Sequence, residues 1–255
     1  MTATSNRDDA PDPDQEAATM GSDDEAFARA RARTYALLAA TFDGEVAVLR
    51  RAMVADDFAR FADVVPGELD AAALGRDDVD AQALQVGYDN LFDVPGPHYV
   101  PPFASAHEDD PSEEFESDST YHEAGEAGEL FGDSTVSVSA HYGRFGFNPD
   151  RGDGIPDHVA AEFEFVAALA DREAAVLAED DADPEVVQEL RRAQRTFVAN
   201  GLEWLDDFAG AVSRKDDAEG VFAALARFAA HFVQWDARSL GDAIDSSVDA
   251  EMTSA

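Results

Sequence analysis

The chain lacks cysteine altogether and holds a single lysine, Lys215, among its 255 residues. Without cysteine there is no disulfide, no thiolate nucleophile and no cysteine-ligated metal. No apolar run approaches the roughly 18 residues that a membrane-spanning helix needs. The first twenty residues are acidic and polar and lack the apolar core of an export signal. We therefore expect a cytoplasmic protein that makes no stable membrane insertion.

Basic residues are scarce as a class, because 18 Lys and Arg face 55 Asp and Glu and the formal net charge is −37. Such a charge repels itself in dilute buffer, whereas molar salt shortens the Debye length to about 3 Å and screens it. The composition therefore predicts a halophilic protein. The alternatives are an acidic tail for cationic partners and a disordered chain. Acidic residues in every segment argue against the first, and a 45% hydrophobic fraction with 17 Phe argues against the second.

Signatures of nucleic-acid binding and of catalysis are also missing. Phosphate contacts need clustered Lys and Arg, so we expect no nucleic-acid partner. None of the six His follows a Glu by three places, as a di-iron bundle requires, and there is no His-Glu-x-x-His, phosphate loop or nucleophile elbow. His158 and Glu162 share a helical face, but no second pair completes a metal site. We expect a non-catalytic protein with no metal and no cofactor of its own.

Apolar residues recur at helical spacing along most of the chain, and strand-like alternation occurs only at 135–139. A capping box at Ser22-Asp23-Asp24-Glu25 predicts a helix start. Further helices are expected within 46–65, 79–92, 157–178, 184–208 and 217–237. The prediction is an all-α fold, a single-domain helical bundle of about seven to ten helices over residues 22–240. Disordered tails are expected at 1–21, which is acidic, and at 241–255.

An acidic insert at 107–132 interrupts this domain, with ten Asp or Glu and neither Lys nor Arg. We interpret it as a solvated, mobile surface segment. The alternative is a flexible acidic arm that attracts the basic front of a client peptide.

Four of the eleven prolines fall within eight residues, at Pro95, Pro97, Pro101 and Pro102. Proline fixes φ and restricts the preceding residue, so this loop is held in one extended shape. Such a stiff, apolar loop suits either a buried connector or the wall of a binding site.

Together with later residues, this loop resembles the TorD/DmsD family of chaperones, which help molybdenum-cofactor oxidoreductases mature before export. The residues that carry the resemblance are Tyr88-x-x-Leu91-Phe92-x-x-Pro95-Gly96, Pro101-Pro102-x-x-Ser105, Tyr142-x-x-x-Gly146 and Asp157-His158-x-x-x-Glu162. The similarity runs from about Ala32 to about Trp235. Near Phe197 to Trp204 the family often has a His where this chain has Asn200-Gly201, so no role is carried over there.

The resemblance implies a chaperone that binds the twin-arginine signal peptide, the apo form, or both, of a molybdopterin oxidoreductase of DMSO, TMAO or nitrate reductase type until its cofactor is inserted. An Arg pair followed by an apolar stretch needs carboxylates and an apolar groove. Asp157, at a helix start that favours its ionised form, would supply the carboxylate. The expected peptide-binding residues are Tyr88, Leu91, Phe92, Pro95, Pro102, Ser105, Tyr142, Asp157, His158 and Glu162.

Other interpretations remain open from the sequence. Asp157 also suits a helix-start residue that satisfies backbone N–H groups, and spacing alone places Leu91 and Phe92 in a core as readily as in a groove. Two further hypotheses are an assembly chaperone that binds its client away from the signal and an acidic helical adaptor with no maturation role. The molybdenum cofactor in any case belongs to the client.

Overall fold

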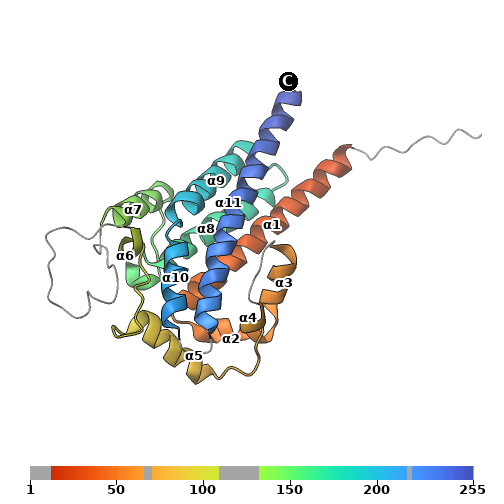
Figure 1. Cartoon of the computed structure of the whole chain (residues 1–255). Helices are drawn as coiled ribbons and strands as arrows, with labels where there is room; N and C mark the ends of the chain where they lie inside the picture. The colour runs from red at the N-terminus through yellow and green to blue at the C-terminus, as the bar shows by residue number, and fades with distance from the viewer. Residues whose placement is uncertain (1–12, 66–70, 109–131, 217–219, 255) are drawn as a thin grey trace, which may run out of the picture.

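The computed structural model of the protein describes residues 13–65, 71–108, 132–216 and 220–254 (Figure 1). Helices make up the regular secondary structure of these residues, so the all-α prediction is confirmed. The helices are α1 (Pro13–Phe42), α2 (Val46–Val54), α3 (Asp57–Val64), α4 (Ala71–Leu74), α5 (Ala81–Tyr88), α6 (Ser105–Glu108), α7 (Asp133–Phe145), α8 (Val159–Leu177), α9 (Pro184–Thr196), α10 (Leu205–Lys215) and α11 (Val221–Ser254).

Short helical segments of other types interrupt this series: the π-helical turns η1 (Asp89–Asp93) and η3 (Phe197–Gly201), and the 3₁₀ turn η2 (Gly152–Gly154). The helices α4 and α6 are single turns of four residues each. Nine longer α-helices therefore remain in the described ranges, within the seven to ten that the sequence predicted.

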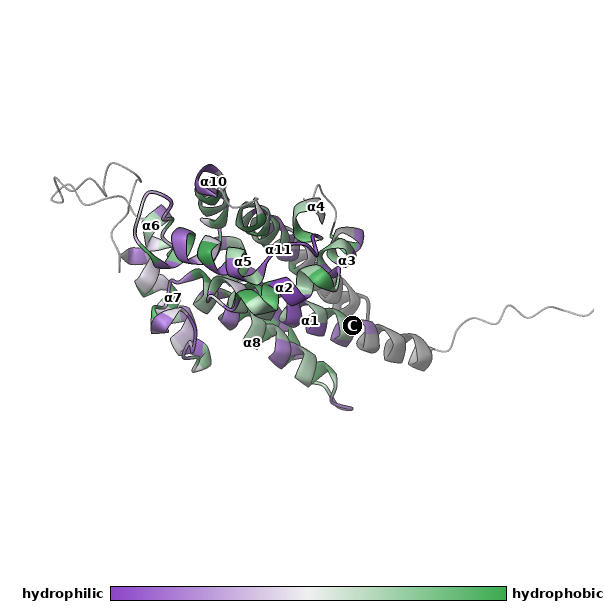
Figure 2. Cartoon of the chain, turned by 90° about the horizontal axis from the view of Figure 1, so that it is seen from below, coloured by the Kyte–Doolittle hydropathy of each residue, from purple (hydrophilic) through white to green (hydrophobic). Residues whose placement is uncertain are grey.

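The long helices α1 and α11 cross the molecule, and α8 and α9 lie beside them, with α1 packed along α8 and α10 along α11 (Figure 1). Hydrophobic residues follow α8 and α11 through the middle of the bundle, while the outer end of α10 is polar (Figure 2). Phenylalanine rings fill the core: that of Phe42 lies 5.8, 6.0 and 5.7 Å from those of Phe92, Phe163 and Phe208. The core is thus shared by α1, η1, α8 and α10.

A buried polar network ties the long helices together. Arg31 on α1 donates through two nitrogens to the carboxylate of Asp236 on α11, and Tyr35 donates to the same carboxylate at 2.8 Å. Arg31 also reaches Glu173 on α8 at 3.3 Å, and Arg191 on α9 donates to Glu173 at 2.6 Å. Two arginines and two carboxylates balance in charge, so each buried ion has a partner, as burial requires.

The helix ends differ from the sequence prediction. The capping box at 22–25 lies inside α1, which begins at Pro13, and α11 continues to Ser254. Parts of both expected tails, 13–21 and 241–254, are therefore helical in the structure. In the second tail Ile244 is buried, one turn beyond the buried Leu240 on the same face of α11. Residues 1–12 of the first expected tail and 109–131 of the acidic insert expected at 107–132 lie outside the described residues.

Two predicted elements also differ in detail. The expected helix over 184–208 is divided by η3 and the turn that follows it into α9 and α10. The alternating residues at 135–139 lie within α7. Among the described residues, no helix is both long and apolar enough to cross a lipid bilayer.

Candidate functional site

The proline-rich loop and the start of α8 meet in the fold. The N–H of Val159 donates to the carbonyl of Pro102 at 2.9 Å, and the N–H of Ala104 donates to the carbonyl of Asp157 at 2.9 Å. The N–H of Ser105 donates to Oδ2 of Asp157 at 3.1 Å. Residues more than fifty positions apart in the sequence are thereby fastened together, and the two halves of the predicted site are neighbours.

The carboxylate that was expected to bind a guanidinium lies inside the protein. Asp157 is 1% exposed and Ser105 is fully buried. Oδ1 of Asp157 and Oγ of Ser105 have no hydrogen-bond partner among the described residues. In this conformation Asp157 fastens the loop to α8, and its carboxylate is closed to an external guanidinium.

His158 is the N-cap of α8, where its Nδ1 accepts the N–H of Ala160 at 3.1 Å. Burial lowers the pKa of His158 to about 4, against the opposing effect of Asp43, Asp153 and Asp157. The ring is therefore neutral at neutral pH, which is the state that an accepting Nδ1 requires.

Glu162 and Tyr142 are buried behind this N-terminus. Oε2 of Glu162 accepts the indole N–H of Trp204 at 3.1 Å, and the hydroxyl of Tyr142 donates to the carbonyl of Pro156 at 2.8 Å. Burial, with the charges of Glu162 and Asp157, raises the pKa of Tyr142 well above its usual value. Sequence reasoning missed this role of Trp204, because 42 positions separate it from Glu162 and no motif connects the two.

Leu91 and Phe92 occupy core positions. They are 2% and 5% exposed, and the ring of Phe92 packs against those of Phe208 and Phe222. Pro102 is also buried. Of the ten predicted residues, Pro95 is exposed and Tyr88 is half-buried, so these two offer surface to a partner.

Tyr88 stands at the edge of an acidic surface. Its hydroxyl donates to the carbonyl of Phe42 at 2.9 Å. Burial, and after it the nearby carboxylates of Asp43, Asp93, Asp89 and Asp153, raise the pKa of Tyr88.

We call Tyr88, Asp89, Asp93, Val94, Pro95 and Asp153 the Tyr88 surface. Asp93 and Asp153 are exposed, and neither forms an ion pair with a described residue. Arg151 neutralises part of the surrounding charge by pairing with Asp43 at 3.0 Å and Glu45 at 2.7 Å. Sequence analysis missed Asp153 because it follows Tyr88 by 65 positions and belongs to none of the quoted motifs.

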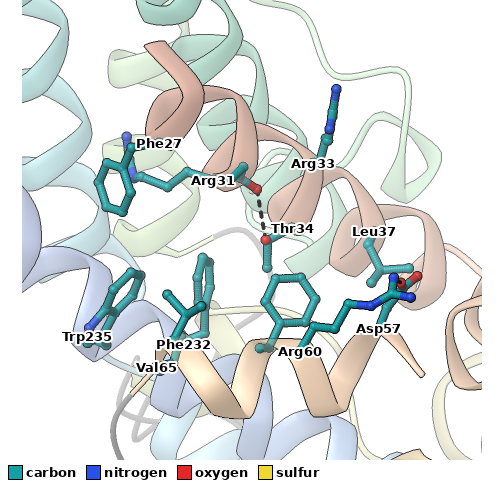
Figure 3. A pocket seen from close by; sticks show the side chains of 13 residues that line it. Phe27, Arg31, Arg33, Thr34, Leu37, Asp57, Arg60, Val65, Phe232 and Trp235 are labelled. Carbon is teal, nitrogen blue, oxygen red and sulfur yellow. Dashed lines mark hydrogen bonds and ion pairs between the residues drawn. The ribbon is translucent and has the colours of Figure 1, made fainter. Parts of the chain in front are cut away.

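A second candidate is a groove of about 480 Å³ between α1, α3 and α11 (Figure 3). Large apolar side chains form most of its wall, from Phe27, Leu37, Phe61, Val64, Val65, Phe232 and Trp235. Thr34 also lines it, but its hydroxyl donates to the carbonyl of Ala30 at 2.9 Å within α1 (Figure 3). That polar group is therefore satisfied without a ligand. We call this cavity the α1–α3–α11 groove.

Charged residues surround the mouth of the groove. Arg33 is exposed and extends from α1 away from the centre of the cavity, whereas Arg60 runs along α3 and pairs with Asp57 at 2.8 Å (Figure 3). The guanidinium of Arg31 stays in the buried network behind the wall and lies 5.9 Å from the ring centroid of Phe27. With Arg31 neutralised in that network, Arg33, Arg60 and Asp57 set the charge at the mouth of the cavity.

Within the described ranges, no group of three or more His, Asp or Glu is arranged to hold a metal ion.

Comparison with protein families identifies the chain. The model of the nitrate reductase delta subunit family matches residues 52–210, which is more than half of the sequence. The chain belongs to this family. Its members are chaperones for the maturation of molybdoenzymes. The comparison with curated proteins found no match, and the comparison with solved structures found none either.

The family match covers the two candidate sites unequally. Residues 52–210 include the proline-rich loop, the start of α8 and all of α3. They exclude α1 and α11, which contribute most of the wall of the α1–α3–α11 groove. Family membership therefore bears on the loop and α8 more directly than on the groove.

Proposed function

We propose that this protein is a cytoplasmic maturation chaperone for the catalytic subunit of a molybdopterin oxidoreductase of DMSO, TMAO or nitrate reductase type. It binds the twin-arginine signal of that subunit and retains the apoenzyme until the cofactor is inserted. The observation that carries the proposal is the family match, which includes the loop and the start of α8. The chaperone carries out no catalytic step and keeps no cofactor, since the molybdenum cofactor belongs to the client.

The Tyr88 surface, which contains two of the predicted site residues, Tyr88 and Pro95, suits an arginine pair. Exposed carboxylates bind guanidinium groups in bidentate geometry, and Asp93 and Asp153 are exposed beside a half-buried tyrosine. Val94 is 53% exposed and Pro95 is exposed, so apolar contacts are available next to these charges. The buried residues Leu91, Phe92, Pro102, Ser105, Tyr142, Asp157, His158 and Glu162 hold the loop against α8 and so position this surface.

Capture of the client tests the function. A tagged full chain is expressed with the molybdopterin reductase subunit encoded in the same genome, once intact and once without its signal. We expect the intact apo subunit to be recovered with the chaperone and the shortened one to be recovered poorly. Recovery of neither form would contradict the proposal and favour an acidic adaptor.

A second candidate is a chaperone that binds its client away from the signal. The burial of Asp157 and the presence of a separate apolar groove favour it. Equal recovery of the intact and the shortened subunit in the capture experiment would select this function.

Isothermal titration tests the Tyr88 surface itself. The ligand is the client's signal peptide, with its Arg pair intact or replaced by Lys, because lysine does not reproduce bidentate guanidinium contacts. The variant Asp93→Asn/Asp153→Asn should lose about 1.5–3 kcal/mol of affinity for the Arg peptide. The matched control is Asp180→Asn/Asp181→Asn, which removes the same charge from an exposed turn after α8. Equal binding of the Arg peptide by both double variants would show that the signal peptide does not bind at the Tyr88 surface.

A further inference from the structure

The α1–α3–α11 groove has an apolar interior and arginines at its mouth. This is unusual in a chain with so few basic residues. The protein has 18 basic residues against 55 acidic ones, yet the mouth of this cavity carries Arg33 and Arg60 against the single carboxylate of Asp57. Its volume of about 480 Å³ lies in the range of roughly 300–1,000 Å³ that is typical of binding cavities. Phe27 is 38% and Val64 65% exposed, so part of the apolar wall faces solvent.

The arginines at the mouth are available to an incoming anion. Arg33 is exposed and forms no ion pair with a described residue. The Arg60 side chain is 75% exposed, and its pair with Asp57 joins adjacent turns of α3. Exposed pairs of this kind contribute little to stability, so a ligand carboxylate can take the place of Asp57. Apolar contacts in the groove would exclude water around the new pair and strengthen it.

Charge also decides which occupants fit. The basic front of a twin-arginine signal would be repelled by Arg33 and Arg60, whereas a segment with apolar side chains and a carboxylate is attracted. A second copy of this chain brings a further net charge of −37, which opposes self-association in dilute buffer. Segments 1–12 and 66–70 of the chain carry only Met1 and Leu69 as large apolar side chains, too few to fill the cavity.

We propose that the α1–α3–α11 groove binds an amphipathic helical segment from the mature part of the client subunit. Apolar side chains spaced three or four residues apart enter between α1, α3 and α11, which is the helix-in-groove mode of recognition. An Asp or Glu on the flank of that helix pairs with Arg33 or Arg60. The identity of the partner rests on the proposed function, whereas its chemistry follows from the groove.

The test uses the full chain and overlapping 20-residue peptides that cover the mature catalytic subunit, titrated by calorimetry. One variant, Arg33→Glu/Arg60→Glu, reverses the charge of the mouth. Its control, Arg172→Glu/Arg192→Glu, makes the same change at two exposed arginines of α8 and α9 that are absent from the groove. We expect at least one peptide with apolar residues at helical spacing and a carboxylate to bind. Its affinity should fall at least tenfold in the first variant and less than twofold in the control.

Reversal of the peptide's acidic residues to Lys should weaken binding to the wild type and restore it in Arg33→Glu/Arg60→Glu. The proposal is overturned if no peptide binds, if binding is insensitive to both reversals, or if light scattering shows a dimer that only the mouth variant dissociates. Capture of the intact subunit is scored separately with the same variants. If the wild type captures the intact subunit but no peptide binds in a way that depends on Arg33 and Arg60, the groove proposal is refuted and the chaperone function is retained. If the wild type fails to capture the subunit, the chaperone function itself is refuted.

Discussion

Gly152 shows how a single residue fixes the start of α8. Its backbone is left-handed, with φ +64°, and a Cβ at this position would lie 2.6 Å from Cβ and Cγ of His158. No atom can be added there without displacing the residue that caps α8. Gly154 has a similar φ of +75° but no heavy atom within 4 Å of the equivalent position. The two glycines therefore share a left-handed backbone, which glycine adopts without strain, and differ in crowding.

This pair allows a matched prediction for stability. Gly154→Ala should cost about 1–2 kcal/mol, because a left-handed conformation is unfavourable for alanine. Gly152→Ala should cost about 1–3 kcal/mol more, which is the usual penalty of overpacking. Urea unfolding of both variants at one fixed KCl concentration gives the two free energies. Equal losses would mean that the His158 side chain moves aside freely.

Asp157 is predicted to stabilise the fold through one hydrogen bond. Asp157→Ala removes the acceptor of the buried Ser105 N–H and should cost about 1–3 kcal/mol. Asp157→Asn retains an acceptor oxygen and should cost less. Thermal unfolding of the two variants measures the difference. If alanine is tolerated as well as asparagine, the carboxylate does not fasten the loop to α8.

At the scale of elements, the first turn of α8 depends on a neutral histidine. Burial lowers the pKa of His158 in the folded state to about 4, whereas an unfolded histidine has a pKa of about 6.5. Between these values the unfolded chain binds more protons than the native one, so stability falls as the pH falls. The contribution of the neutral His158 ring to stability is complete above about pH 6.5 and is lost on acidification toward about pH 4. The difference between these two pKa values corresponds to roughly 3 kcal/mol of unfolding free energy.

His158→Asn tests this pH dependence, because asparagine caps helices without titrating. We expect wild type to lose more unfolding free energy than the variant between pH 7 and pH 5, measured by urea unfolding at constant salt. Carboxylates elsewhere titrate alike in both proteins and cancel in the difference. Parallel pH profiles would show that His158 is solvated or protonated in the native state.

Helix boundaries are the level at which sequence and structure diverge most. The apolar spacing in 184–208 is compatible with one helix, yet the chain turns at η3 and restarts as α10. This break brings Trp204, 2% exposed, to Glu162, which lies on another helix. Periodicity reports which residues are buried, and it does not report which helix they are buried against.

For the whole molecule, the net charge of −37 remains the dominant electrostatic fact. The predicted halophilic character has a direct consequence, because screening at a Debye length of about 3 Å removes most surface repulsion. We expect cooperative thermal unfolding in about 2 M KCl, and a lower midpoint with reduced cooperativity in about 0.1 M KCl. Circular dichroism during heating measures both properties. A sodium sulfate series at matched ionic strength serves as the control, and unchanged midpoints in KCl would contradict the prediction.

The sequence by itself determined the all-α fold class and the resemblance to molybdoenzyme chaperones, because apolar periodicity and short motifs are local properties of a chain. It also identified the loop and the helix start that meet at Asp157. Only the tertiary structure decided that Asp157, Leu91 and Phe92 are buried and that Asp153 lies near Tyr88. The groove likewise exists only in the fold, since its walls come from α1, α3 and α11. Burial and long-range proximity depend on how helices pack, and spacing along the chain does not encode that packing.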